Sequence, residues 1–176
     1  MNVLIGQRLT LRPIVKKDLE KLNQWKNSEE IYQYLGGGYM PVSIDMQEKW
    51  LENLMDTTGN SKRFIIEDSE KGAVGMVGLY NIHWIHRTCE LGIFLGEFSV
   101  QGKGYGREAY QLVENFALKY LNLRKIKAMV VKDNYAAVKM YDNLNFTIAG
   151  ELVDDRFIDG SYHTVYIMEK FLGRKG

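Results

Sequence analysis

The residue types and spacing at positions 101–106, Gln-Gly-Lys-Gly-Tyr-Gly, favour the binding of a phosphorylated ligand. The segment follows a strand-like run and opens an amphipathic helical pattern, so its three glycines lie at a strand-to-helix junction. Glycine lets the backbone approach a ligand without a side chain in the way. The free N–H groups and the positive dipole end of a helix start favour an anion such as a diphosphate. A helix that happens to begin in a glycine-rich turn is the alternative, because short glycine motifs often occur by chance.

The spacing differs from that of two common phosphate-binding loops. A Walker loop places Ser or Thr directly after its Gly-Lys pair, whereas Lys103 is followed by Gly104. The dinucleotide fingerprint needs a third glycine three residues after the second, and that position is Arg107. The sequence therefore predicts a diphosphate site of another kind.

A second candidate segment lies downstream and begins with a helix-capping residue. The side-chain oxygen of Asn134 can accept a hydrogen bond from the first turn of a helix, and Ala137, Met140, Tyr141 and Leu144 then share one face. A tyrosine on such a face is commonly a core residue whose hydroxyl has a partner. A functional role for Tyr141 requires that this helix face the same cleft as the glycine-rich segment.

One carboxylate interrupts the apolar strand pattern over residues 89–95. Strand alternation puts Glu90, Gly92 and Phe94 on one face. A carboxylate there is costly to bury unless it is paired or takes part in chemistry. An ion pair with Arg87 and a role as a general base are therefore both open for Glu90.

Length, composition and charge exclude several classes of protein. We assign the 176 residues, 45% of them hydrophobic, to a single domain over 1–176. A net charge of +1 without a long basic run argues against nucleic acid as a partner. No apolar run reaches the roughly 20 residues of a membrane span, and the start lacks the layout of an export signal. With one cysteine, no internal disulfide can form, and a cytoplasmic protein is expected.

The periodicity predicts an α/β fold in which helices pack on a mixed sheet. Strands are expected at 8–14, 63–67, 73–80, 89–95, 125–131, 146–153 and 162–171, with turns at 70–72 and 159–160. Helices are expected at 16–35, 43–55, 104–121 and 135–144. The third is predicted to bury Ala109, Leu112, Val113, Phe116, Ala117, Tyr120 and Leu121. The second, capped by Ser43, is predicted to bury Met46, Trp50, Leu51 and Leu54.

Together these segments resemble the GNAT N-acetyltransferases over about residues 8–170. Gln101-x-x-Gly104-x-Gly106 is similar to their acyl-CoA pyrophosphate loop, and Asn134-x-x-Ala137-x-x-x-Tyr141 to their second cofactor segment. The opening Thr10-Leu11-Arg12-Pro13 resembles the branch that includes ribosomal-protein N-terminal acetyltransferases and spermidine acetyltransferases. The spermidine enzymes are also similar at Ile85-His86-Arg87 and at Leu123-Arg124-Lys125-Ile126.

The resemblance implies a mixed, mostly antiparallel sheet of about seven strands with helices on both faces. It also implies a homodimer, and acetyl transfer from acetyl-CoA to a primary amine by direct attack. Tyr141 matches the family's acid for the thiolate leaving group, and we choose Glu90 as the base. A backbone N–H on the 89–95 strand matches the donor to the reacting carbonyl oxygen. The implied acetyl-CoA contacts are Phe94, Leu95, Gln101, Gly102, Lys103, Gly104, Tyr105, Gly106, Arg107, Asn134, Ala137 and Tyr141.

The acceptor is expected to be a small amine of the polyamine or amino-sugar type. Acidic and aromatic side chains attract ammonium groups, and the expected contacts are Glu29, Glu30, Tyr39, Trp84 and His86. Three histidines and a lone cysteine make a poor zinc set, so no metal is expected. A protein N-terminus is the alternative acceptor, and a non-catalytic acyl-CoA-binding domain is the alternative from another class.

Overall fold

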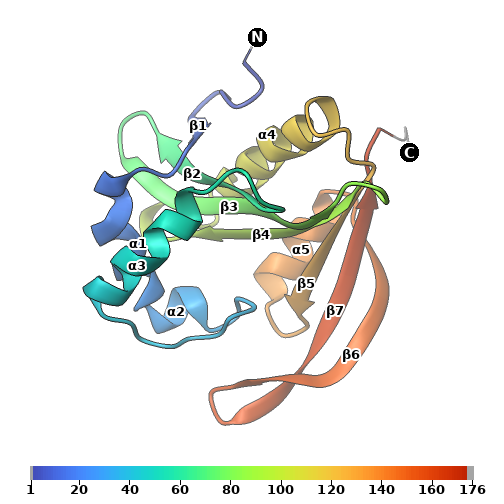
Figure 1. The fold of residues 1–176 in the computed structure, drawn as a ribbon. Coiled ribbons are helices and arrows are strands. Elements are labelled where there is room, and N and C mark those ends of the chain that lie inside the picture. The colour runs from blue at the N-terminus through green and yellow to red at the C-terminus, as the bar shows by residue number, and fades with distance from the viewer. Residues whose placement is uncertain (1, 174–176) are drawn as a thin grey trace.

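One sheet of seven strands, in the order β1-β2-β3-β4-β5-β7-β6, organises this computed structural model, which describes residues 2–173 (Figure 1). Every neighbouring pair is antiparallel except β4 and β5, which are parallel. The strands are β1 (Leu9–Arg12), β2 (Lys62–Asp68), β3 (Gly72–His83), β4 (Thr88–Leu95), β5 (Lys125–Val131), β6 (Thr147–Ile158) and β7 (Ser161–Phe171). The mixed, mostly antiparallel sheet that the resemblance implied is confirmed.

Helices cover both faces of the sheet, as expected (Figure 1). On one face lie α1 (Leu19–Lys26), α2 (Glu29–Tyr32) and α3 (Ile44–Met55), and on the other α4 (Tyr105–Lys119) and α5 (Tyr135–Asn143). Two short 3-10 turns complete the set, η1 (Lys16–Asp18) and η2 (Phe98–Val100). None of the helices within residues 2–173 has the length and apolar character needed to cross a membrane.

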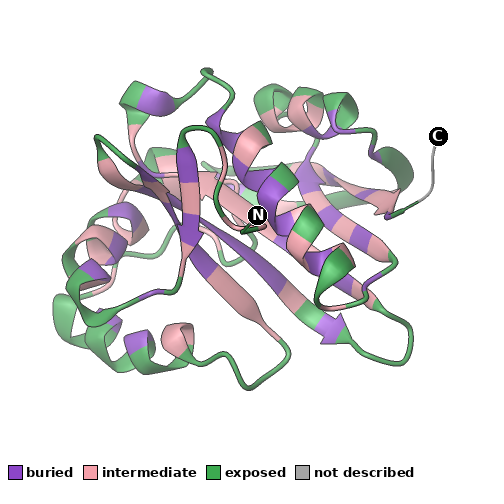
Figure 2. Ribbon diagram, turned by 90° about the horizontal axis from the view of Figure 1, so that it is seen from above, coloured by how far each residue is buried: buried purple, intermediate pink, exposed green. Residues whose placement is uncertain are grey.

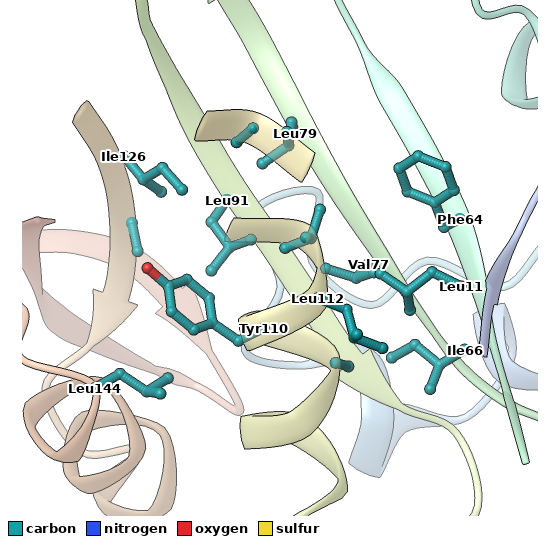
Figure 3. Close-up of a cluster of buried hydrophobic side chains, with 14 of the residues drawn as sticks. Leu11, Phe64, Ile66, Val77, Leu79, Leu91, Tyr110, Leu112, Ile126 and Leu144 are labelled. Carbon is teal, nitrogen blue, oxygen red and sulfur yellow. The ribbon is translucent and has the colours of Figure 1, made fainter. Parts of the chain in front are cut away.

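The larger core lies between the sheet and helix α4. Ala109, Val113 and Ala117 have no exposed surface, and these small side chains let the helix approach the strands closely. Figure 3 shows Tyr110 of α4 beside Leu91, with Ile126 and Leu144 nearby. The predicted buried face omitted Tyr110 and was wrong for Tyr120, which is 66% exposed because the helix already ends at Lys119. Figure 2 shows the buried stripe along this helix and the strands below it.

The helix predicted over 16–35 is wrong as a continuous element. It breaks after Lys26, and the backbone of Ser28 is extended. The break is held by Asn27, whose Oδ1 accepts from the Val42 N–H at 2.7 Å and whose Nδ2 donates to the Val42 carbonyl at 2.9 Å. A side chain that bonds a distant backbone in this way competes with continuation of the helix.

Helix α3 is capped as predicted but buries fewer residues than expected. The Oγ of Ser43 accepts from the Met46 N–H at 3.2 Å. Met46 and Trp50 are 40% and 42% exposed, so their predicted burial is wrong, while Leu51 is buried. The helix packs mainly on α1 rather than on the sheet, and a contact with one helix covers only a narrow stripe.

The hairpin of β6 and β7 is longer than predicted and lies at the end of the sheet. Its turn at Asp159 and Gly160 has positive φ values of 45° and 77°, as turn residues of these types allow. The pairing register shifts between Leu152 and Arg156. Such irregularities re-aim side chains, and Arg156 lies where the hairpin passes the α2 region.

Candidate active site

The parallel strands β4 and β5 pair over only part of their length. The ladder runs from Thr88 opposite Lys125 to Glu90 opposite Lys127, and the described residues form no pair between these strands beyond it. A cavity of about 830 Å³ occupies the resulting gap. Its walls include residues 91–95 of β4, 129–131 of β5 and, from the start of α5 onward, Asn134, Ala137, Met140 and Tyr141.

The gap leaves backbone donors of β4 without a strand partner. Just beyond β4, Gly96 donates its N–H to the Val74 carbonyl of β3 at 2.8 Å. Because N–H groups alternate in direction along a strand, those of Ile93 and Leu95 point towards the gap instead. The Leu95 carbonyl also faces that way and accepts from Gln101 Nε2 at 3.3 Å. The cavity wall thus offers N–H groups for hydrogen bonds with a bound molecule.

The glycine-rich segment forms a left-handed turn at the start of α4, near one end of the gap. Gly102 and Gly104 have φ values of 70° and 80°, a conformation that other residues rarely adopt. Gly104 is the N-cap, so the first-turn N–H groups that follow it have no partner within the helix. A helix start of this kind is the type of geometry that binds anions in proteins.

An arginine that the sequence analysis missed lies beside this turn. Arg8 Nη1 donates to the Lys103 carbonyl at 3.0 Å, and its Nε donates to Glu108 at 2.9 Å. Its guanidinium stacks over the Tyr105 ring at 4.5 Å and is 43% exposed. A cation held here adds charge complementarity for a diphosphate. In the sequence Arg8 is only the first residue of the strand expected over 8–14. Nothing there links it to Lys103, which lies 95 residues away.

The Tyr105 side chain does not face the turn's open side. Its hydroxyl donates to Asp68 Oδ2 at 2.8 Å, and that hydrogen bond raises the pKa of the phenol. The contact ties the start of α4 to the end of β2, which keeps the N–H groups of the first turn in place. Tyr105 therefore has its backbone, rather than its ring, available to a ligand.

Tyr141 lies on the cavity side of α5. It is 6% exposed, and its ring packs edge-on against Phe146 with centroids 5.0 Å apart. Within residues 2–173 its hydroxyl has no hydrogen-bond partner, and burial raises its pKa, so the proton stays in place at neutral pH. Asn134 Oδ1 accepts from the Ala137 N–H at 3.3 Å, which confirms the predicted cap. A phenol in this position can donate a proton or a hydrogen bond into the cavity.

Glu90 lies at the point where the two strands separate, and it lines the cavity. The ion pair with Arg87 does not form, because Arg87 points away and donates to Asn122 Oδ1 at 3.2 Å. In the part of the chain that the structure describes, no other cation pairs with Glu90 either. The Glu90 carboxylate therefore lies at the cavity wall without an ion-pair partner among these residues.

The cavity continues from the strand gap to the α2 region. Of the predicted acceptor contacts, Glu30 lines it, whereas Glu29, Tyr39, Trp84 and His86 do not. The indole of Trp84 donates to Asn60 at 3.0 Å instead, and the His86 ring stacks on His83. Further polar and aromatic lining comes from Tyr32, Tyr34, Arg63, Tyr80 and Arg156. Among residues 2–173, no cluster of His, Cys, Asp or Glu is arranged to hold a metal ion.

Comparison with known proteins identifies the family. The sequence profile of the acetyltransferase (GNAT) domain matches residues 8–147. The spermidine N(1)-acetyltransferase of Vibrio cholerae is 31% identical over 174 residues, which cover 97% of this chain and 99% of that protein. The enzyme of the same name from Escherichia coli K12 is 30% identical over 159 residues, 90% of this chain and 83% of that one. The crystal structure of the V. cholerae spermidine N-acetyltransferase with CoA and spermine has a TM-score of 0.85 at 31% identity, covering 94% of this chain and 96% of that chain.

Fold and site thus define an acyltransferase. The chain belongs to the GNAT acetyltransferase family, as its two motifs implied, and it moves the acetyl group of acetyl-CoA to a primary amine. This assignment replaces the alternative of a non-catalytic acyl-CoA-binding domain. The site fits that cofactor: a Cβ added to Gly102 would meet no atom within 4 Å, Arg8 lies beside the same turn, and a cavity of about 830 Å³ occupies the strand gap. When bound, acetyl-CoA supplies an activated acyl thioester.

Proposed function

We propose that the acceptor is a primary amine of a small metabolite, of the polyamine or amino-sugar type, which reacts inside the cavity between β4 and β5. The observation that carries the proposal is that Tyr141, Glu90 and Glu30 line one cavity together with Tyr32 and aromatic neighbours. Carboxylates and aromatic faces attract an ammonium group. Relatives named for spermidine, one of them crystallised with spermine, support an aliphatic amine.

The proposed roles follow from proton chemistry. An alkyl ammonium group has a pKa near 10.4 in water, so it must lose a proton before it can attack. Glu90 takes that proton, directly or through a water molecule. Tyr141 holds its proton at the hydroxyl for the leaving sulfur. The backbone N–H groups of Ile93 and Leu95 donate to the carbonyl oxygen as it gains negative charge.

The proposed cofactor contacts follow from the turn at the start of α4. The N–H groups of Gly104, Gly106 and Arg107 hold the diphosphate, and the Arg8 guanidinium neutralises part of its charge. Gln101 and the wall residues Phe94, Leu95, Asn134 and Ala137 line the same cavity as Tyr141, and they contact the rest of the cofactor.

A screen of primary amines with acetyl-CoA, in which thiol release is measured, tests the proposal. Free polyamines, amino sugars and diamino acids should give turnover, and peptides with free N-termini should not. Turnover with peptides alone would support the ribosomal-protein type of acceptor instead. The absence of turnover with every amine, in protein that binds acetyl-CoA, would contradict the proposed acceptor class.

We also propose that the protein forms a homodimer and acts in the cytoplasm. The edge strand β6 exposes Ile148, Val153 and Phe157, and an apolar sheet edge is typical of contacts between subunits. The lone Cys89 is a free thiol, so this fold needs no oxidising compartment. Light scattering should give the mass of two chains, and Val153→Lys should shift it towards one. A wild-type protein that is monomeric at micromolar concentration would contradict the dimer.

A further inference from the structure

Arg156 is a cation inside the acceptor part of the cavity. It comes from β6, lines the cavity, and is half-buried. Its Nη1 donates to the Tyr34 carbonyl at 2.9 Å. Within residues 2–173, no carboxylate forms an ion pair with it. The neighbouring Asp155 is exposed and acts on it only at longer range.

The hydrogen bond to one backbone carbonyl leaves most N–H donors of the Arg156 guanidinium available for another molecule. Arginine has five N–H donors in a planar fork, and the bond to Tyr34 uses one of them. A partly buried charge is costly unless it is paired. Burial lowers the pKa of Arg156, which agrees with incomplete solvation of the group. A role limited to bridging β6 and the α2 region needs a hydrogen-bond donor there, but not a charge.

The other charged groups of the cavity are placed differently. Arg63 donates to the Asn53 carbonyl at 3.1 Å and lies over the Tyr80 ring, so its guanidinium already has two contacts. Glu30 and Glu90 are the acidic lining residues, and neither is paired with Arg156. The cavity therefore presents carboxylates for an ammonium group and a separate guanidinium fork for an anion.

We propose that Arg156 binds an anionic group of the acceptor, so that the preferred substrate carries a carboxylate or a phosphate together with its primary amine. The inference rests on the proposed acceptor class and narrows it. Guanidinium groups bind both anions through two parallel hydrogen bonds, which fix orientation as well as position. An acceptor of this kind places its ammonium group by Glu90 and its anion by Arg156. A simple diamine supplies no anion for Arg156, so it should react less efficiently than its anionic analogue.

Matched pairs of amines that differ only in the anion test this proposal and identify the anion. Lysine against cadaverine isolates a carboxylate, and glucosamine 6-phosphate against glucosamine isolates a phosphate. With the full chain, the anionic member of one pair should have the higher kcat/KM by about 10- to 100-fold, the range of a charge-assisted contact. The pair that shows the difference identifies the anion as a carboxylate or a phosphate.

Variants assign the preference to Arg156. Arg156→Gln keeps a donor for the Tyr34 carbonyl and should remove the preference, through a higher KM for the anionic member alone. Arg156→Lys keeps the charge and should retain part of the preference for the anionic member. Arg87→Gln removes an exposed arginine outside the cavity and should leave kcat/KM unchanged for both members of each pair. Turnover of the member that lacks the anion reports that each variant is folded.

Two outcomes would overturn the inference: preference for the member without the anion in both pairs, or an equal effect of Arg156→Gln on both members. Calorimetry with the same four amines gives a readout independent of turnover. If wild-type protein acetylates none of them and no polyamine of the amine screen, the proposed acceptor class fails. Binding of the anionic members that Arg156→Gln weakens would still support the anion site, and binding that it leaves unchanged would refute it.

Discussion

The ring of Tyr80 lies against the backbone of two glycines, Gly78 and Gly92. A Cβ added to Gly92 would lie 2.9 Å from Cε2 of the ring, and one added to Gly78 would lie 2.6 Å from it. Gly78 and Gly92 are directly opposite each other in the β3–β4 ladder. The cross-strand glycine pair therefore lets Tyr80 lie flat on the sheet, and this position sets one wall of the cavity.

Gly92→Ala should lower activity by displacing that ring. The added methyl group forces Tyr80 towards the cavity, and a shift of about 1 Å near reacting groups can cost about 100-fold in rate. We expect kcat/KM to fall by about 10- to 100-fold, as measured by thiol release. Gly150→Ala is the matched control, because a Cβ there meets only Ile167 Cδ1 at 3.9 Å. Equal activity in the two variants would contradict the role of the glycine pair in positioning Tyr80.

Tyr141→Phe should lower turnover without weakening acetyl-CoA binding. The change removes the hydroxyl but keeps the ring that packs on Phe146. Loss of a general acid costs about 100-fold or more in kcat, while the calorimetric Kd for acetyl-CoA should change less than about threefold. Tyr120→Phe, at an exposed position after α4, serves as the control. Unchanged kcat in Tyr141→Phe would remove this residue from the acid role.

Gly104→Val should abolish cofactor binding. A branched side chain at φ 80° strains the turn and occupies the space of the diphosphate. Gly160→Val has the same strain at φ 77°, in a hairpin turn with open space around it. Both variants should lose about 1–2 kcal/mol of stability, but only Gly104→Val should raise the acetyl-CoA Kd by about 100-fold or more. Wild-type affinity in that variant would rule out a diphosphate at this turn.

Asp18→Asn should destabilise the fold in a pH-dependent way. Asp18 is 3% exposed, and its carboxylate accepts from Arg12 at 2.8 and 2.9 Å and from the Val15 N–H at 2.9 Å. Burial acts to raise its pKa, but these hydrogen bonds outweigh it and the pKa is lowered. The free energy of unfolding at pH 7 should fall by about 3 kcal/mol in the variant.

The sign of the pH effect follows from that lowered pKa. The carboxylate stabilises the fold above the unfolded-state pKa of about 3.9, and this contribution disappears as pH falls through the lower folded-state pKa. The difference between wild type and Asp18→Asn, measured by denaturant unfolding, should therefore shrink in acid. Asp45→Asn, at an exposed position, should change stability by less than about 0.5 kcal/mol. A difference that grows in acid would contradict the pairing.

Cys89 should be unreactive in the native protein. Its side chain has no exposed surface, and burial raises the pKa of the thiol to about 12. The thiolate is the reactive form, and at pH 8 almost none is present. Ellman's reagent should detect no protein thiol before denaturation and one per chain afterwards. Immediate reaction of the native protein would show that the thiol is accessible.

Several features of the site were predictable because they depend on neighbouring residues alone. The left-handed turn at Gly102 and Gly104 and the Asn134 cap follow from local backbone preferences. The apolar face that carries Tyr141 follows from helical periodicity. The break at Asn27 was not predictable in this way, since it depends on Val42, a partner in another segment.

The sequence by itself determined the strands, most helices, the two motifs and, through their order, the family. The tertiary structure alone decided where β4 and β5 stop pairing, and hence which side chains face one cavity. Arg8 reaches the turn before α4, and Tyr80 and Arg156 reach the acceptor space, only because the sheet brings distant segments together. Local preferences act over a few residues, whereas sheet order and register depend on packing of the whole chain.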